Sequence, residues 1–174
     1  VDDLLLLDDG KIRLKVLKIE DDDVHCEVIY PGKLSNHKGI NRRGGGLNAK
    51  ALTAKDKADL SFALGLNVDY IALSFPRDAN DVKEMRQLIL AEGGDAGIVA
   101  KIERCEAVDN IIEIIKAADG VMVARGDLAV EIGASEVPLV QQEIIQHARS
   151  LNKPVIVATQ MLESMITSPI PTRA

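Results

Sequence analysis

Residues 98–127 read IVAKIERCEAVDNIIEIIKAADGVMVARGD, and this stretch decides the fold class. A short apolar segment opens it at residues 98–103, and a second one closes it at residues 121–127. Between them, four aliphatic side chains recur at the spacing of one helical face: Val108, Ile111, Ile112 and Ile115. The stretch therefore predicts strand, helix and strand, the unit from which a parallel sheet is built.

The same alternation continues on both sides of this unit. Further strands are predicted at residues 70–75 and 155–160, and helices begin near Thr53, near Asp81 and near Pro138. Apolar strands separated by amphipathic helices predict a parallel sheet covered on at least one face. A doubly wound sheet and a (β/α)8 barrel both fit, but a barrel needs about 250 residues. We therefore expect a piece of a larger α/β enzyme.

The first 45 residues follow a different pattern. Residues 4–7 and 11–19 are predicted strands joined by the turn residues Asp8-Asp9-Gly10, and a third strand follows near residues 24–28. This predicts a small antiparallel β module. Gly44-Gly45-Gly46 ends it, and because no Gly-Lys-Ser/Thr follows, we interpret it as a flexible crossing point between domains rather than a phosphate cradle.

Composition excludes several classes of protein. The 174 residues are 47% hydrophobic and 28% charged, which excludes wholesale disorder. A net charge of −6 and only 2% aromatic residues argue against a nucleic-acid partner. Cys26 and Cys105 are too far apart for a Cys-x-x-Cys metal site or a disulfide framework. No apolar run is long enough to cross a membrane, so we expect a cytoplasmic protein without a membrane partner.

Charged and polar side chains stand at the carboxyl ends of the predicted strands, where active sites form in parallel α/β folds. Lys101 and Glu103 are two positions apart in one strand and so point to the same face, and Asp127 ends the next strand. Two carboxylates with open positions suit Mg²⁺. A functional site is favoured over the alternative, a structural ion-pair cluster.

Two further positions extend this candidate site. Gly126 admits a ligand close to the backbone, and its N–H with that of Asp127 can grip a carboxylate. Thr159 adds a hydroxyl on the following strand, although a hydroxyl that bonds its own backbone is an equally good interpretation.

Several blocks of the sequence resemble pyruvate kinase. They occur in the order of that family and cover nearly the whole chain: LLLLDDGKI at 4–12, NHKGIN at 36–41, LTAKDKADL at 52–60, SFPR at 74–77, KIE at 101–103, VMVARGDLAVEI at 121–132, ATQMLESM at 158–165 and PTRA at 171–174. The family usually has Gly where this chain has Ala129, for which we expect local repacking.

The resemblance implies a partial (β/α)8 TIM barrel with part of an inserted small antiparallel β-barrel lid domain. Residues 1–45 would be the C-terminal half of the lid, and residues 46–174 would hold barrel strands four to seven. It also implies the conversion of phosphoenolpyruvate and ADP to pyruvate and ATP, in a homotetramer. The K⁺ ligands of the family would lie outside this chain.

The resemblance further implies a role for each site residue. Lys101 would stabilise the enolate and the transferring phosphoryl group, and Glu103 and Asp127 would bind Mg²⁺ or Mn²⁺. The substrate carboxylate would lie on Gly126, Asp127 and Thr159. Thr159 would also act near the protonation step, and Lys38, in the lid, would contact the nucleotide.

Two other interpretations of the chain stay open. One is a metal-dependent aldolase or lyase that acts on a pyruvate enolate, and the other is an inactive structural fragment. The lid and the lysine beside the metal ligands argue against the lyase. The histidines, His25, His37 and His147, lack metal-ligand spacing and receive no catalytic role.

Overall fold

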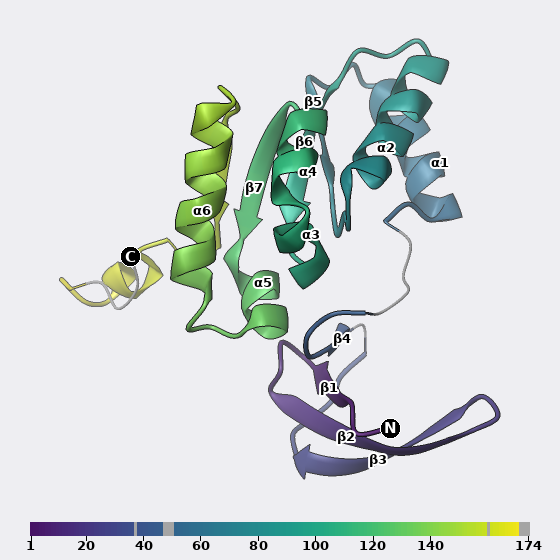
Figure 1. Cartoon of the computed structure of the whole chain (residues 1–174), viewed down its shortest axis with the longest axis vertical. Helices are drawn as coiled ribbons and strands as arrows, with labels where there is room; N and C mark the ends of the chain where they lie inside the picture. Colours follow the sequence, from purple (N-terminus) through teal and green to yellow (C-terminus); the bar gives the residue numbers. More distant parts are fainter. Residues whose placement is uncertain (37, 47–50, 160, 171–174) are drawn as a thin grey trace.

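The computed structural model describes residues 1–36, 38–46, 51–159 and 161–170, in which two four-stranded sheets are found (Figure 1). The antiparallel sheet has the order β3-β2-β1-β4, built from β1 (Leu4–Leu7), β2 (Ile12–Glu20), β3 (Asp23–Tyr30) and β4 (Ile40–Arg42). The parallel sheet has the order β5-β6-β7-β8, built from β5 (Tyr70–Leu73), β6 (Gly97–Ile102), β7 (Gly120–Ala124) and β8 (Val155–Ala158).

The antiparallel sheet confirms the three predicted strands and adds one. Asp8, Asp9 and Gly10 all have positive φ, which turns the chain tightly between β1 and β2. The additional strand, β4, pairs with β1. Its three residues are too few to show a period in the sequence, so only the pairing reveals it.

One helix precedes the parallel sheet, the others lie between its strands, and a 3-10 turn follows it. Their bounds are α1 (Ala54–Leu64), α2 (Ala79–Ala91), α3 (Cys105–Asp109), α4 (Ile111–Ala117), α5 (Arg125–Ile132), α6 (Val137–Ser150) and a 3-10 turn (Glu163–Ile166). Thr53 caps α1, and a reciprocal bond with Asp56 completes the predicted capping box. Among the described residues, no helix is long and apolar enough to cross a bilayer.

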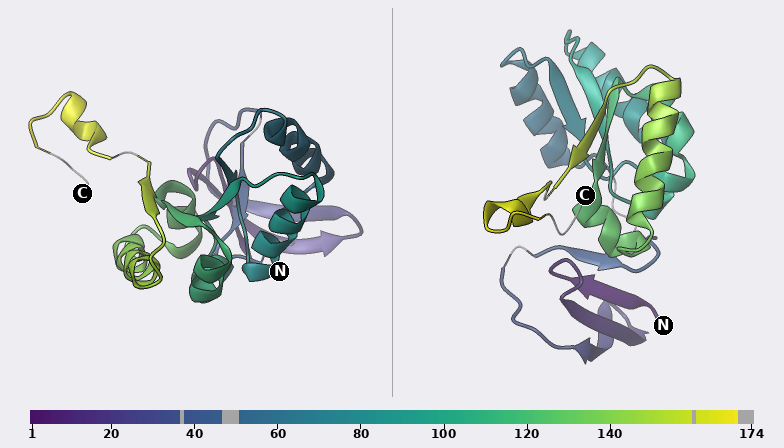
Figure 2. Two further views of the ribbon diagram at one scale, coloured as in Figure 1. Left: turned by 90° about the horizontal axis from the view of Figure 1, so that it is seen from above. Right: turned by 90° about the vertical axis from the view of Figure 1, so that its left-hand side faces the viewer.

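The two faces of the parallel sheet differ in burial. Helices α2, α4 and α6 cover one face, on which Ile98, Ala100 and Val121 are fully buried (Figures 1 and 2). The opposite face is more open, since Tyr70 is 60% exposed and Ile156 is 46% exposed. Lys101 pairs in register with Met122, which pairs with Ile156, so Lys101 lies on this open face. The prediction of a parallel sheet covered on at least one face is confirmed.

Two sequence predictions about the elements are wrong. The single helix expected around residues 108–115 is two helices, because the side-chain amide of Asn110 donates to the carbonyl oxygens of Glu106 and Arg77 at the break. Ile112, expected on the buried stripe, is 42% exposed.

The strand expected over residues 121–127 ends at Ala124. Arg125, Gly126 and Asp127 form the first turn of α5, because the buried positions Leu128 and Glu131 follow a helical spacing. Gln160, His37 and residues 171–174, which carried predictions above, lie outside the described residues.

Candidate functional site

An ion pair between a partly exposed lysine and a buried carboxylate stands at the carboxyl end of β6. Lys101 Nζ lies 2.7 Å from Glu103 Oε1, and it donates a hydrogen bond of 3.0 Å to Ser74 Oγ, just after β5. The expectation that Lys101 and Glu103 lie together is confirmed. The lysine is held in place from two neighbouring strands, so its charge has a fixed position at the edge of the sheet.

Glu103 is a carboxylate enclosed by protein. It is fully buried, and its Oε2 accepts a hydrogen bond of 2.8 Å from the Phe75 N–H. Burial raises the pKa of Glu103, against the opposing effects of Lys101 and the Phe75 N–H, and the negative charge of Asp127 raises it further. Two carboxylates therefore repel each other at this site, and a cation between them would relieve that repulsion.

The Oε1 atom of Glu103 supports the same conclusion. It is buried and has no hydrogen-bond donor of good geometry among the described residues, and only the charge of Lys101 faces it. A buried carboxylate oxygen with spare lone pairs next to a second carboxylate is a donor set that suits Mg²⁺ or Mn²⁺. The residues present therefore fit a divalent cation.

The start of α5 and the end of β8 meet beside this pair. A Cβ placed on Gly126 would lie 3.7 Å from Thr159 Oγ1, which is an ordinary van der Waals distance. A side chain at this position would therefore not clash with Thr159. Thr159 has positive φ, and its hydroxyl donates to the Ala158 carbonyl at 2.7 Å. The backbone-bonded alternative for this hydroxyl is thus the arrangement present in the structure.

Arg125 was not assigned a role from the sequence. Its Nε donates to the Ala158 carbonyl at 3.1 Å, and its Nη2 donates to the Thr159 carbonyl. The side chain thereby ties the end of β8 to the first turn of α5. An arginine at the end of a predicted strand was the only available signal, and it does not identify a partner 33 residues away.

Lys38 lies in the antiparallel part of the structure. Its Nζ forms an ion pair of 2.8 Å with Asp8 Oδ1, while Lys11 binds the other oxygen of Asp8 at 3.1 Å. The hydrogen bond to Asp8 raises the pKa of Lys38, so the lysine stays charged. Among the contacts of the described residues, Lys38 pairs with Asp8 and not with Lys101 or Glu103, so its predicted nucleotide contact remains a prediction.

A cavity of about 1260 Å³ lies between the two sheets. Lys11, Arg13 and Arg43 line it from the side of the antiparallel sheet, and Asp127 and Thr159 line it from the other side. The volume is above the ~300–1,000 Å³ of a typical small-molecule pocket, so it has room for a nucleotide. Of the site residues, Gly126, Asp127 and Thr159 face this space together with the charged side chains of the antiparallel part.

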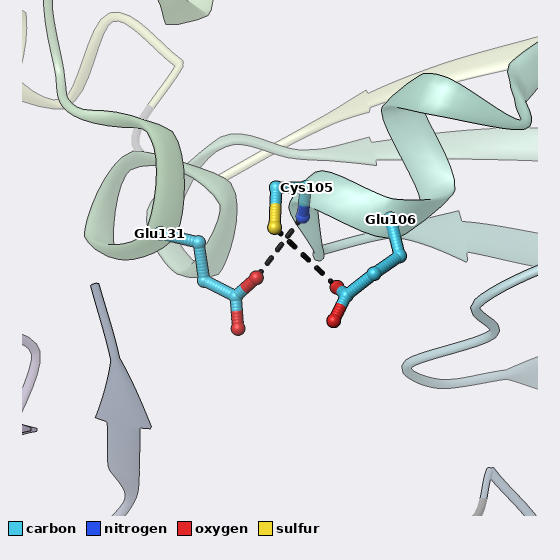
Figure 3. A group of neighbouring side chains, drawn as sticks. All are labelled: Cys105, Glu106 and Glu131. Carbon is cyan, nitrogen blue, oxygen red and sulfur yellow. Dashed lines mark hydrogen bonds between the residues drawn. The ribbon is translucent and has the colours of Figure 1, made fainter. Parts of the chain in front are cut away.

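A second cluster of potential metal ligands lies nearby (Figure 3). Cys105 Sγ donates to Glu106 Oε2 at 3.4 Å, and the Cys105 N–H donates to Glu131 Oε2 at 3.0 Å. Burial and the neighbouring carboxylates raise the pKa of Cys105 to about 12, so the thiol is protonated at neutral pH. Hydrogen bonds from the thiol and the N–H of Cys105 hold the cluster together.

Comparison with known proteins gives one consistent result. The whole chain, residues 1–174, matches the family model described as pyruvate kinase, barrel domain. It is 56% identical over 177 residues to a pyruvate kinase of Buchnera aphidicola subsp. Acyrthosiphon pisum, covering 100% of this chain and 37% of that relative. It is 56% identical over 175 residues to pyruvate kinase II of Salmonella typhimurium, covering 99% of this chain and 36% of that relative. The chain thus spans a little over a third of the length of the curated relatives it matches.

Proposed function

Because the chain belongs to the pyruvate kinase family, we propose that it carries part of the catalytic machinery that transfers the phosphoryl group of phosphoenolpyruvate to ADP, giving pyruvate and ATP. The single observation that carries this proposal is the ion pair of Lys101 with the buried Glu103, electrostatically coupled to Asp127, at the carboxyl ends of parallel strands. Active sites of parallel α/β folds lie at these ends.

The same proposal assigns the two sheets to two domains. Residues 46–174 form part of a (β/α)8 barrel with strands four to seven, and residues 1–45 form part of the lid. The open face of the parallel sheet supports this assignment, because it would become the interior once the other strands closed the barrel. Lys101 would then stand inside the mouth of the barrel.

Glu103 and Asp127 are the residues that would hold Mg²⁺ or Mn²⁺. When bound, the ion supplies positive charge for the enolate and phosphate oxygens. The family's K⁺ would be bound by residues outside this chain. The enclosed Glu103 carboxylate and its repulsion by Asp127 are what support this assignment.

Lys101 provides the charge that this chain itself contributes to the reaction. Phosphoryl transfer needs little covalent chemistry from the protein, since positioning and charge stabilisation do most of the work. The ammonium group of Lys101, fixed by Ser74 and Glu103, neutralises charge on the phosphoryl group and the enolate. The hydrogen bond to Ser74 and the ion pair with Glu103 hold the ammonium group in place before the substrate binds.

The substrates would meet in the cavity between the lid and the barrel. The N–H groups of Gly126 and Asp127 at the start of α5 would bind the substrate carboxylate, and Lys38 of the lid would bind the nucleotide. Thr159 would lie near the carbon that takes up a proton. Closing the lid would exclude water, so that ADP receives the phosphoryl group. We place the enzyme in the cytoplasm, as a homotetramer.

The test is an activity assay on a full-length chimera. Residues 1–174 replace the matching segment of pyruvate kinase II from Salmonella typhimurium, and pyruvate formation from phosphoenolpyruvate is measured with and without ADP. We expect turnover that requires both ADP and a divalent cation. Pyruvate formation without ADP would mean hydrolysis of phosphoenolpyruvate by water and would contradict transfer to ADP. The lyase would instead release pyruvate by carbon–carbon cleavage of a longer 2-oxo acid, without any nucleotide. The 174-residue chain alone should show negligible turnover, because part of the barrel and of the site is missing.

A further inference from the structure

The proposed mechanism leaves one buried carboxylate unused. Glu131, near the end of α5, is only 5% exposed. Its Oε2 accepts a hydrogen bond of 3.0 Å from the Cys105 N–H (Figure 3), and its Oε1 accepts one of 3.4 Å from Asn41 Nδ2. Each carboxylate oxygen of Glu131 therefore accepts a hydrogen bond from another segment of the chain, as buried polar groups in folded proteins usually do.

These two bonds join three parts of the molecule. Asn41 belongs to β4, the strand on which the chain leaves the antiparallel sheet. Cys105 begins α3, two residues after Glu103, and Glu131 lies one helical turn after Asp127 on α5. One carboxylate thus connects the lid to the segments that carry both proposed metal ligands.

A second set of contacts reinforces the same junction. The Gly46 N–H donates to Glu106 Oε1 at 2.7 Å, and the Gly44 N–H donates to the Glu131 carbonyl at 3.4 Å. Gly45 is buried, and a Cβ there would lie only 2.2 Å from Cys105 Sγ. The triple glycine, expected to be a flexible crossing point, is therefore docked closely on α3.

We propose that Glu131 is a positioning residue that couples the lid to the phosphoryl-transfer site. By holding Asn41 and Cys105 together, its carboxylate fixes the position of the lid, where the nucleotide is proposed to bind, relative to Lys101 and Glu103. This inference rests on the proposed function. It assigns no contact between Glu131 and substrate, since the residue acts through the segments it joins.

The chemistry of the two bonds defines a sharp test. The Cys105 N–H and Asn41 Nδ2 both donate to the Glu131 carboxylate, and the amide of E131Q has one acceptor and one donor. E131Q keeps both bonds, because the Asn41 amide turned over accepts from the glutamine NH₂ group through its carbonyl oxygen. N41D is therefore the variant that breaks the bridge, since it sets two carboxylates against each other. The double variant E131Q/N41D restores the bond, because the glutamine NH₂ group then donates to the aspartate carboxylate.

The experiment compares these variants in the full-length chimera. A matched control is E113Q, which removes the same charge at an exposed position on α4. The readouts are kcat and KM for ADP and for phosphoenolpyruvate, the thermal midpoint, and amide hydrogen exchange of residues 40–46. Loss of a hydrogen bond to a charged group typically changes an equilibrium by about tenfold or more.

We expect N41D to lower kcat/KM for ADP by about tenfold and to speed exchange of residues 40–46, since its bond to the barrel is broken. E131Q should show a much smaller effect, because its two bonds persist. The KM for phosphoenolpyruvate should stay within about twofold, because its proposed contacts lie on α5 itself. E131Q/N41D should recover most of the ADP effect and the slow exchange. E113Q should behave like the unsubstituted chimera.

The proposal is overturned by either of two results. One is an N41D variant with unchanged ADP kinetics and exchange. The other is a parallel loss for both substrates in N41D that follows the thermal midpoint and is not rescued by E131Q, which would mean a merely structural role. If the unsubstituted chimera makes no pyruvate, the proposed function fails. The exchange of residues 40–46 in the unsubstituted chimera, N41D, E131Q and E131Q/N41D still decides whether the Glu131 bridge exists.

Discussion

Replacement of Lys101 by methionine tests the proposed site most directly. Methionine keeps an unbranched apolar side chain of similar length and removes the ammonium group that lies 2.7 Å from Glu103 Oε1 and 3.0 Å from Ser74 Oγ. The fold should survive, because Lys101 lies on the more open face of the sheet rather than in the core beneath the helices.

Two effects follow from the geometry. Removal of one preorganised electrostatic group typically lowers kcat by about 10²- to 10³-fold, so we expect K101M to lose at least ~10²-fold in turnover. The variant also strips Glu103 of its cationic partner, which changes the pKa of that carboxyl group.

The sign of the second effect is definite. Burial already raises the pKa of Glu103, and Lys101 opposes that rise. Without the lysine the pKa rises further, so the carboxylate is protonated at a higher pH. Because only the deprotonated form binds a metal, the Mn²⁺ affinity of K101M should be retained at alkaline pH and should begin to fall at a higher pH than in the parent.

The assay uses the full-length chimera with initial rates of ADP-dependent pyruvate formation, and Mn²⁺ binding by electron paramagnetic resonance across a pH series. K116M is the matched control, since Lys116 forms an exposed ion pair with Glu113 on α4. Normal turnover in K101M would remove the lysine from the mechanism. An unchanged pH dependence of Mn²⁺ affinity would refute the electrostatic coupling of Lys101 to Glu103.

Two further predictions concern stability. G45A should lower the unfolding free energy by about 2–4 kcal/mol, combining positive-φ strain with a Cβ only 2.2 Å from Cys105 Sγ. G44A, at a similar φ but with nothing within 4 Å, should show the strain alone, and equal losses in urea denaturation would argue against the contact. Burial tends to raise the pKa of Asp119, but the Ile98 N–H and its ion pair outweigh burial and hold it below the ordinary value. The stabilisation by Asp119 is therefore present above its ordinary pKa and is lost as pH falls through the folded-state pKa. The thermal midpoint of D119N should therefore fall less steeply than that of the parent when the pH is lowered.

The sequence predicted most of the strands and helices and the pairing of Lys101 with Glu103. Apolar periods located the parallel strands and the capping box of α1, because both are patterns within a few residues. The same local rule placed Lys101 and Glu103 on one face, as the 2.7 Å ion pair confirms. The metal, substrate and nucleotide roles of the site residues stay proposals.

Errors occurred where a short segment satisfied two local patterns at once. Arg125-Gly126-Asp127 continues an apolar strand and equally begins a helix that buries Leu128, and packing selects the helix. In the sequence, the apolar helical period continues through Asn110. In the structure the helix is interrupted at this residue, and the side-chain amide of Asn110 donates to the carbonyl oxygens of Arg77 and Glu106. Strand β4 was missed because it is three residues long.

What this chain's sequence determined by itself is the alternation of strands and helices and the row of polar groups at the strand ends, since both depend on side-chain periodicity along a few residues. Only the tertiary structure decided which distant groups meet: Lys38 on Asp8, Arg125 on the end of β8, and Asn41 on Glu131, 90 residues apart. A hydrogen bond between such partners arises from how whole elements pack, and neither residue carries a local signal of the other.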